Sequence, residues 1–381
     1  MALDFTVEAR RGAARTGTVR TARGTFRTPC FMPVGTRGAV RTLSSADLED
    51  LGAEVVLANT YHLMLRPGAD VVARFGGVHG FADWRGHVVT DSGGYQVFSL
   101  RPKVDDEGAT FASTYDGSVH HLSPEGAVDI QLLLDSDIQM GLDVCPPLPS
   151  PPDVIRQAVD RTALWAERAR KTFLAHGRRD LSQFGIVQGG VDLGLRAESA
   201  ARTVAIGFEG YAVGGLSVGE DRSEMLPALG AALAGLPDDR PRYFMGLGDP
   251  LGIVDVVALG VDMFDCVLAT RLGRHGTLLT SAGRLNLRNR RFADDTGPVD
   301  ETCACPVCAR WSRGYLRHLL SVDEPTAPRL LTIHNVHWTL DLVRRIRQAI
   351  VDGRLAELRA ELAERWPATG GRDGEPPPST R

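Results

Sequence analysis

Eight short apolar runs, separated by polar or Gly-rich loops and helical segments, restrict the fold of this chain more than any other feature. The runs have the length of buried β-strands and occupy residues 30–34, 54–59, 87–90, 138–144, 184–187, 210–213, 243–245 and 263–268. Helical patterns lie between many of them, at residues 47–51, 124–134, 152–175, 195–206, 223–234 and 251–258. Eight alternating units predict an α/β protein with a (β/α)8 barrel, the TIM-barrel architecture, in preference to an open doubly wound sheet.

Further segments surround this predicted barrel. An Arg-rich hairpin at residues 15–32 is expected to present a solvated face, and a second hairpin lies within residues 99–122. We assign residues 1–276 to the barrel with its N-terminal hairpin, 277–333 to an insertion and 334–366 to a C-terminal helix that closes the barrel, with the helix itself at 336–364. The Pro- and Gly-rich residues 367–381 are expected to be disordered.

Polar side chains follow the predicted strands, one strand after another. The carboxyl ends of parallel barrel strands open on one mouth, where the sites of this fold lie. Each residue alone is also explained as a turn former, because Asp and Asn favour turns, but the repeated coincidence favours a site. The residues are Asn59, Asp91, Asp143, Gln188, Gly214, Gly215, Leu216, Glu220, Met245 and Asp265.

Two carboxylates at one mouth, Asp91 and Asp265, suit displacement at an anomeric carbon, because one can attack while the other moves protons. The oxygens and amide of Asp143 and Gln188 suit the edge of a purine-like or pteridine-like ring. Such a ring has two candidate stacking partners, Tyr95 and Met245, and a bare backbone for close approach at Gly215 and Leu216. A phosphate loop at GGLSVG is the weaker alternative, since the Lys-Ser/Thr of that motif is absent.

A cluster of arginines follows the last predicted strand without an intervening acidic residue. On a chain with a formal net charge of −4, this local patch suits the phosphates of a nucleic acid, and a solvated basic face is the alternative. We expect the first two of these arginines to lie in a loop beside Asp265. The cluster comprises Arg271, Arg274, Arg284, Arg288, Arg290 and Arg291.

Three of the six cysteines, Cys303, Cys305 and Cys308, lie within six residues, which is typical of metal binding rather than of a secreted disulfide framework. Their C-x-C-x2-C spacing predicts one structural Zn²⁺ in the insertion, with His334 as the best fourth ligand; reduced structural cysteines are the alternative. The N-terminus has no apolar signal core and no run is long enough to span a membrane, so we expect a cytoplasmic protein without a membrane partner.

The residues Trp311, Tyr315 and His318 share one face of a predicted helix, which is either local core or a partner surface. Taken together, several motifs resemble the bacterial-type queuine tRNA-ribosyltransferase (tRNA-guanine transglycosylase) family over roughly residues 15–365. They are LANTYHLMLRPG, TDSGGYQVFSL, YAVGGLSVGE, FMGLG, GVDMFDCVLATR and the C-x-C-x2-C with its distant histidine.

The resemblance implies a glycosyltransferase (pentosyltransferase) of queuosine biosynthesis. Such an enzyme exchanges guanine at the wobble position of tRNAs with a G-U-N anticodon for 7-aminomethyl-7-deazaguanine, through a covalent ribosyl–Asp intermediate. It also implies one zinc per subunit, held by Cys303, Cys305, Cys308 and His334, and a homodimer whose interface contains the Trp311 helix. Cys145 and Val218 match the bacterial pattern, which favours the aminomethyl base over the bulkier queuine.

The same resemblance implies a role for each residue of the mouth. Asp265 would be the nucleophile and Asp91 the general acid/base. The base edge would be read by Asp143, Gln188 and the Gly215 amide, its faces covered by Tyr95 and Met245, and its aminomethyl group taken by the Leu216 carbonyl with Glu220 nearby. The uridines that flank guanine in a U-G-U anticodon loop would be held by Arg271 and Arg274.

Two other functions remain open at this point. A glycoside hydrolase accounts for the two carboxylates but leaves the cysteines and arginines without a role. A non-catalytic RNA-binding subunit of the same family accounts for the arginines, but such a subunit is expected to lack the nucleophile, and Asp265 is present.

Overall fold

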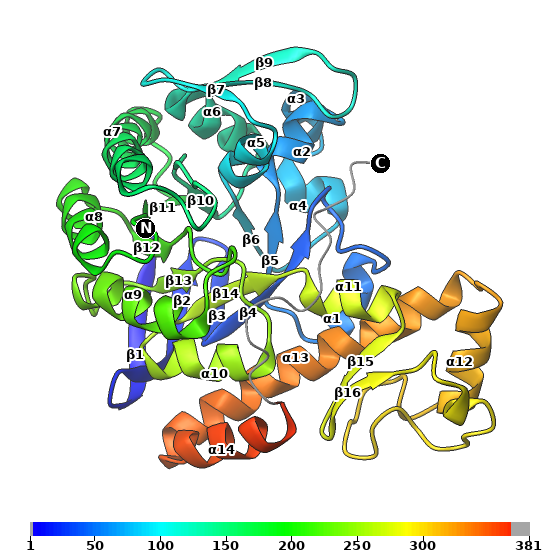
Figure 1. Ribbon diagram of the computed structural model, residues 1–381. Coiled ribbons are helices and arrows are strands. Elements are labelled where there is room, and N and C mark those ends of the chain that lie inside the picture. Colours follow the sequence, from blue (N-terminus) through cyan, green and yellow to red (C-terminus); the bar gives the residue numbers. More distant parts are fainter. Residues whose placement is uncertain (1–2, 367–381) are drawn as a thin grey trace.

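Eight parallel strands close into a barrel in this computed structural model, which describes residues 3–366. All eight predicted strands are present, most of them within a few residues of the predicted ends, and the (β/α)8 barrel is therefore confirmed (Figure 1). Neighbours around the barrel run β10-β11-β12-β13-β14-β4-β5-β6. The strands are β4 (Cys30–Gly35), β5 (Val55–Ala58), β6 (His87–Thr90), β10 (Ile138–Met140), β11 (Ser182–Val187), β12 (Gly210–Val213), β13 (Arg242–Phe244) and β14 (Met263–Cys266).

Helices surround this barrel, and each predicted helix between strands is found. Ser123, the predicted N-cap, accepts a hydrogen bond from the amide of Gly126 at 3.0 Å and so begins α6 where expected. The helices are α1 (Ser45–Asp50), α2 (Thr60–Leu65), α3 (Ala69–Arg74), α4 (Gly77–Ala82), α5 (Gly94–Ser99), α6 (Pro124–Leu134), α7 (Pro152–Ala175), α8 (Leu193–Ile206), α9 (Arg222–Ala234), α10 (Pro250–Ala258), α11 (Leu268–Arg274), α12 (Arg313–Ser321), α13 (Thr326–Asp352) and α14 (Leu355–Arg365).

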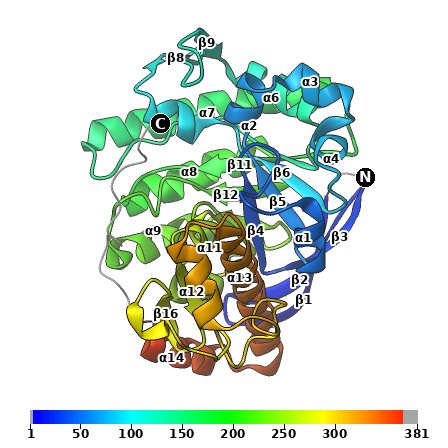
Figure 2. The same cartoon turned by 90° about the vertical axis from the view of Figure 1, so that its right-hand side faces the viewer.

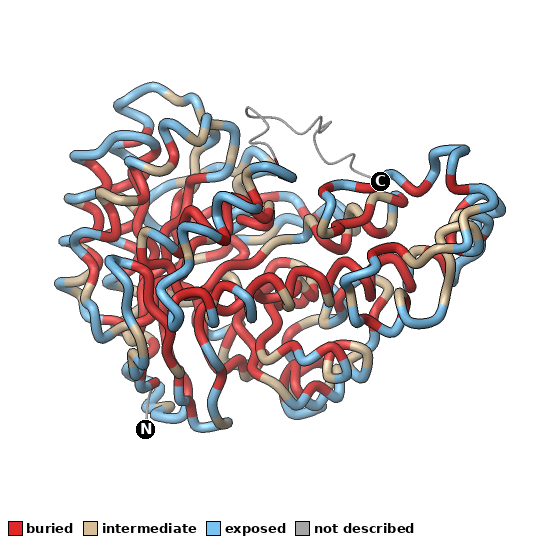
Figure 3. The backbone as a smooth tube through the Cα atoms, turned by 90° about the horizontal axis from the view of Figure 1, so that it is seen from below, coloured by how far each residue is buried: buried red, intermediate tan, exposed pale blue. Residues whose placement is uncertain are grey.

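An antiparallel sheet of β1 (Asp4–Arg11), β2 (Ala14–Thr21) and β3 (Gly24–Thr28) closes the amino-terminal end of the barrel. Apolar side chains of this sheet, among them Phe5 and Val19, join the buried cluster that fills the barrel interior. Figure 3 shows this interior as a continuous buried region inside an exposed outer layer. With one end closed, the carboxyl ends of the strands form the open mouth.

The N-terminal sheet corrects one expectation. The predicted hairpin is present as β2 and β3, but β1 was not predicted, and the Arg-rich face is only partly solvated. Arg20 is exposed, whereas Arg15 is fully buried and pairs with Asp262, with Nε–Oδ1 at 2.9 Å and Nη2–Oδ2 at 2.6 Å. This bidentate pair compensates the desolvation of both charges and joins the sheet to the residue just before β14.

Two hairpins extend from the barrel, both as predicted. One follows α5 and contains β7 (Lys103–Val104), β8 (Ala109–Ala112) and β9 (Val119–Leu122). The other, β15 (Thr277–Thr280) and β16 (Gly283–Asn286), begins the insertion after β14. Figure 2 shows the first hairpin at one end of the molecule, above α2 and α6, and the insertion beside α13 at the other.

The carboxyl-terminal region differs from the prediction of one helix at 336–364. Instead α13 begins at Thr326, inside the segment assigned to the insertion, and ends at Asp352, where Gly353 adopts a left-handed conformation with φ +74° before α14 begins. A glycine can adopt this φ without a steric penalty, so it ends α13. The predicted disordered tail at 367–381 lies outside the described residues.

Among residues 3–366, no helix combines the length and the apolar character that crossing a membrane requires.

Candidate active site and metal centre

The carboxyl ends of the barrel strands bring the predicted polar residues to one mouth. Asp91 directly follows β6, Asp143 follows the neighbouring strand β10, and Asp265 is the third residue of β14. The pKa of Asp91 is raised to about 7, mainly by burial, and the charges of Asp265 and Asp143 contribute to this rise. This electrostatic influence means that the three carboxylates share one site.

Asp91 is held by the start of α2. Its Oδ1 accepts hydrogen bonds from the amides of Thr60 at 2.9 Å and Gly93 at 3.1 Å, and its Oδ2 accepts one from the side chain of Asn59. Asn59 is also the N-cap of α2, since its Oδ1 accepts from the amide of His62. Asn59 therefore uses Oδ1 to cap α2 and Nδ2 to orient Asp91, the general acid/base candidate.

Asp265 is buried, and both of its described donors use the same oxygen. Its Oδ1 accepts from the Tyr243 hydroxyl at 2.6 Å and from the Gly246 amide at 2.9 Å. Burial raises the pKa of Asp265, whereas these two hydrogen bonds lower it. The sequence analysis did not identify Tyr243; its inward position in β13 was the available signal.

Asp143 and Gln188 meet beside the β12 loop. The Gln188 side-chain amide donates to Asp143 Oδ2 at 2.6 Å, and burial raises the pKa of Asp143 to about 6. A Cβ atom at Gly215, where φ is +65°, would lie 2.2 Å from Gln188 Oε1. The loop therefore requires glycine here both for its backbone conformation and for space.

Arg196 is a second residue that the sequence analysis missed. It is fully buried on α8, and its guanidinium donates to the carbonyls of Gly190, Val187, Gly214 and Gly215 at 2.7–3.0 Å. Burial lowers the pKa of Arg196 to about 10, so it remains charged near neutral pH. The sequence around Arg196 gives no signal for these contacts, because the partners are backbone carbonyls at the end of β11 and in the loops after β11 and β12.

The remaining base-binding candidates line the same mouth. Tyr95 is 62% exposed and Met245 is half-buried, so a face of each is available to a planar ligand. Leu216 is buried, and Glu220 accepts from the amides of Ser217 and Val218, the latter at 3.1 Å. Glu220 thus closes the loop that presents Leu216.

Arg271 and Arg274 lie in helix α11, and the prediction of a loop at this point is wrong. The helix packs closely on α13, where a Cβ at Gly273 would lie 3.0 Å from the backbone of Leu331. Asn335 of α13 donates to the carbonyl of Ala269 at 3.0 Å, and its Oδ1 accepts from the amide of Leu279. Tertiary packing therefore makes this short segment helical beside Asp265.

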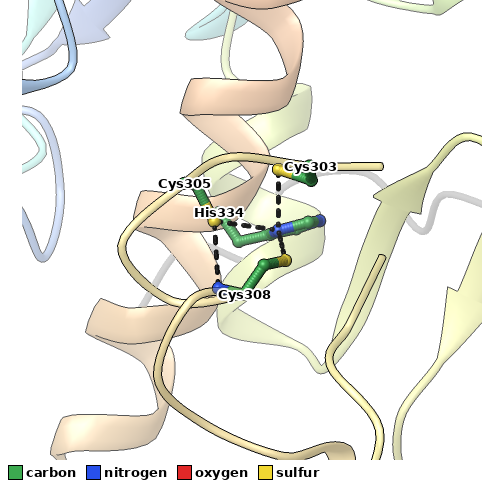
Figure 4. Close-up of side chains that lie close together, drawn as sticks. All are labelled: Cys303, Cys305, Cys308 and His334. Atoms are coloured by element: carbon green, nitrogen blue, oxygen red, sulfur yellow. Dashed lines mark hydrogen bonds between the residues drawn. The ribbon is translucent and has the colours of Figure 1, made fainter. Parts of the chain in front are cut away.

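The four predicted metal ligands lie together where the insertion meets α13 (Figure 4). Their ligand atoms all lie within 4.8 Å of one another, and His334 Nδ1 is 3.3–3.8 Å from the three sulfurs. Ideal tetrahedral zinc bond lengths place sulfur and nitrogen about 3.6 Å apart, so the spacing fits. The set is Cys303, Cys305, Cys308 and His334.

A hydrogen bond on the far side of the ring fixes the tautomer of His334. Its Nε2 donates to the carbonyl of Leu279 at 2.8 Å, which leaves Nδ1 as a lone pair directed at the sulfurs. The sequence predicted that His334 comes just before the last helix, but it lies within α13. The donor set and this orientation fit a closed, structural site.

The predicted helical face of Trp311, Tyr315 and His318 is only partly present. Tyr315 and His318 lie on α12 and are exposed, but Trp311 precedes the Ser312 N-cap and lies outside the helix. These three side chains therefore do not share one helical face.

Comparisons with known proteins identify the family of this chain. The model of the queuine tRNA-ribosyltransferase family matches residues 10–368. A protein named queuine tRNA-ribosyltransferase from Sphingopyxis alaskensis is 50% identical over 367 residues, which cover 95% of this chain and 98% of the relative. One of the same name from Moorella thermoacetica is 46% identical over 369 residues, covering 96% and 98%. With its barrel mouth and Cys3His cluster, the chain therefore belongs to the queuine tRNA-ribosyltransferase family of glycosyltransferase enzymes.

Proposed function

We propose that the chain exchanges guanine at the wobble position of G-U-N anticodon tRNAs for 7-aminomethyl-7-deazaguanine in queuosine biosynthesis. The observation that carries this proposal is the arrangement of Asp265, whose Oδ1 is occupied by two donors, beside Asp91 in the same mouth. A target base inside a folded RNA must leave its stack to reach this mouth, as in other enzymes that act on bases.

The reaction follows from the two carboxylates. Oδ2 of ionised Asp265 attacks C1′ of the ribose, the bond to guanine breaks, and the proton of Asp91 passes to the departing base. The incoming base returns a proton to Asp91 as its nitrogen attacks C1′, and the Asp265 carboxylate leaves. The covalent ribosyl–Asp265 intermediate holds the RNA while the bases exchange.

The pocket beside Asp265 suits the incoming base. Gln188 uses its amide nitrogen on Asp143 and so keeps Oε1 for a donor on the base, next to the Gly215 amide. Tyr95 and Met245 would cover the two faces of the ring. The Leu216 carbonyl, with Glu220 on the same loop, would bind the aminomethyl cation.

Two side chains beside the pocket bear on the size of the incoming base. Burial raises the pKa of the Cys145 thiol to about 12, so this side chain beside the pocket stays neutral. Cys145 and Val218 support the aminomethyl base rather than queuine.

Arg271 and Arg274 would bind the uridines of a U-G-U loop, and a structural zinc would hold the insertion against α13.

We also propose a homodimer that includes α12, and a cytoplasmic location. The two alternative functions fit the molecule less well than base exchange does. A sugar hydrolase leaves the Cys3His cluster and α11 without a role. A non-catalytic subunit leaves Asp265 and its two donors without a role.

Incorporation of labelled guanine into an anticodon stem-loop carrying U-G-U tests the proposal. Asp265→Asn should lower exchange on the order of a thousandfold or more and abolish covalent trapping, while RNA binding persists. Tyr243→Phe keeps the carboxylate and serves as the matched control, with a loss of roughly ten- to a hundredfold.

Each other outcome has a defined meaning. A U-A-U loop should incorporate no guanine. Wild-type protein that binds the U-G-U loop without exchange would support the non-catalytic subunit, and absence of both binding and exchange would return the sugar hydrolase. Full exchange by Asp265→Asn contradicts the nucleophile assignment.

A further inference from the structure

Two exposed arginines share one aromatic ring on the rim of the barrel mouth. The guanidinium carbons of Arg37 and Arg66 lie 5.4 and 4.8 Å from the centre of the Tyr115 ring. Arg37 lies in the loop after β4, Arg66 is the C-cap of α2, and Tyr115 lies in the turn between β8 and β9. Three segments that are distant in sequence therefore build this cluster, which we call the Tyr115 cluster.

The two cations have no compensating charge in the described part of the chain. Neither Arg37 nor Arg66 forms an ion pair with a carboxylate of residues 3–366. The carboxylate adjacent in sequence, Asp116, accepts from the Ser118 amide at 3.1 Å and hydroxyl at 2.7 Å within its own turn. Two like charges on one ring repel each other, and an anion placed between them would relieve that repulsion.

Hydrogen bonds to α2 hold the aromatic ring of the cluster and its turn in place. The Tyr115 hydroxyl hydrogen-bonds Nδ1 of His62 at 2.9 Å, and the neighbouring Thr114 amide donates to the Tyr61 hydroxyl at 3.3 Å. Burial and the charge of Arg37 lower the pKa of His62, so His62 is neutral and adds no third charge. A preorganised pair of guanidinium groups binds a phosphate at a smaller entropic cost than two free side chains.

The same helix connects this cluster to the reaction centre. The first turn of α2 holds Asp91 through Asn59 and Thr60, and its later residues, His62 and Arg66, hold and flank Tyr115. Figure 1 shows the β8–β9 hairpin lying over α2 and α5, at the side of the barrel that carries β5 and β6. A phosphate bound here would be separated from Asp91 by about the length of α2.

The cations on α11 lie along the neighbouring part of the rim. Burial and the charges of Arg41 and Arg271 lower the pKa of Arg274, so these three groups are close together after β14 and β4. Barrel order places β14, β4, β5 and β6 side by side, and the basic rim therefore continues from Arg274 through Arg37 to Arg66. The base-binding residues Asp143, Gln188 and Gly215 follow the strands on the other half.

We propose that the Tyr115 cluster is a second phosphate-binding site for the substrate RNA, on the Asp91 side of the mouth. The inference rests on the proposed tRNA substrate and deepens it: Arg37 and Arg66 grip a backbone phosphate at a distance from the exchanged nucleotide, and Arg271 and Arg274 act on the other side. The two sites together hold the strand on both sides of the extruded base.

Arg37→Gln/Arg66→Gln tests the site against Arg20→Gln/Arg179→Gln. The control removes the same charge from two exposed arginines at the closed end of the barrel, Arg20 on β2 and Arg179 three residues before the start of β11. We expect the test variant to bind the U-G-U stem-loop about ten- to a hundredfold more weakly. Its slope of log Kd against log salt should be smaller in magnitude by about 0.7, because single strands lose roughly 0.7 per neutralised phosphate and the two arginines share one phosphate.

The kinetic readouts separate this site from the reaction centre. The KM for the stem-loop should rise with Kd, while the KM for guanine and kcat at saturating RNA should stay within about twofold of wild type. Tyr115→Phe keeps the ring and should change Kd little, whereas Tyr115→Leu removes the ring and should weaken binding about threefold.

A neutral methylphosphonate placed at one linkage at a time identifies the phosphate. At the contacted linkage, wild type should lose affinity and Arg37→Gln/Arg66→Gln should not. Equal affinities and salt slopes for the test and control variants would overturn the inference. Failure of wild-type protein to exchange guanine would instead overturn the proposed function, so the two failures are distinguishable.

Discussion

Asp91, Asp143 and Asp265 each lose water at the barrel mouth, and the pKa of each carboxyl rises for that reason. Their hydrogen bonds differ: Asp91 accepts from α2, Asp143 from Gln188, and Asp265 from Tyr243 and Gly246. Environments that place similar groups at different pKa values allow one carboxylate to attack while another carries a proton.

The pKa of Asp91, about 7, predicts an alkaline limit on the first half-reaction. Asp91 must be protonated to protonate departing guanine, so the single-turnover rate of covalent complex formation should fall as pH rises through about 7. It should also fall in acid, where Asp265 becomes protonated and cannot attack. Asp91→Asn should be slow and lack the alkaline limb. A rate that stays constant from pH 6 to 9, with constant RNA affinity, would contradict this role.

Gly215→Ala is expected to damage base binding specifically. The new Cβ would clash with Gln188 Oε1, so Gln188 must move away from Asp143. The alanine would also have to adopt the left-handed backbone conformation of Gly215. We expect the KM for guanine to rise about tenfold or more, with little change in RNA affinity. Gly207→Ala is the matched control, since Gly207 has φ +82° and nothing within 4 Å of its Cβ position. Equal guanine KM values for the two variants would count against the pocket.

At the scale of elements, two adjacent residues of α13 bond the insertion to the barrel. His334 directs Nδ1 at three sulfurs and donates to Leu279, and Asn335 bonds β15 and α11. A metal bound at this point would therefore fix α11, with its arginines, as well as the insertion itself.

We expect one Zn²⁺ per chain, released by chelators only as the protein unfolds. His334→Gln should lower both the zinc content and the melting temperature. His337→Gln serves as the control because His337 lies one turn along α13, with Nδ1 3.6 Å from Cys303 Sγ but outside the four-residue set. Metal analysis and thermal unfolding decide the result; full zinc in His334→Gln would remove His334 from the ligand set.

Short elements around the mouth depend on tertiary contacts. The seven residues of α11 have no side-chain N-cap bond, and the helix forms where Gly273 allows α13 to approach. By contrast, the end of α13 has a local signal in the sequence: Gly353, which adopts the left-handed conformation there, separates α13 from α14.

At the scale of the whole molecule, the N-terminal sheet closes one end of the barrel and leaves the other for chemistry. The buried Arg15–Asp262 pair joins that sheet to the barrel. The insertion and the β8–β9 hairpin stand at different sides of the structure, so each can supply a different surface (Figure 2).

The proposed dimer is tested on Tyr315, which is 45% exposed on α12. An exposed tyrosine at an interface loses water on association, so Tyr315→Asp should shift a dimer toward monomer in analytical ultracentrifugation. Val119→Asp, on the 73% exposed side chain of β9, is the matched control and should leave the oligomeric state unchanged. A wild-type monomer at working concentration contradicts the dimer.

The eight strands, most helices, the Cys3His set and the polar residues at the strand ends could be predicted from the sequence, because strand patterning and short ligand spacings are local properties. Which atoms meet depends on the tertiary structure: the Tyr243 hydroxyl with Asp265, the Arg196 guanidinium with four backbone carbonyls, and Arg37 with Arg66 on Tyr115. Such contacts join segments that are far apart along the chain. They depend on strand order and helix placement, which residue periodicity does not encode.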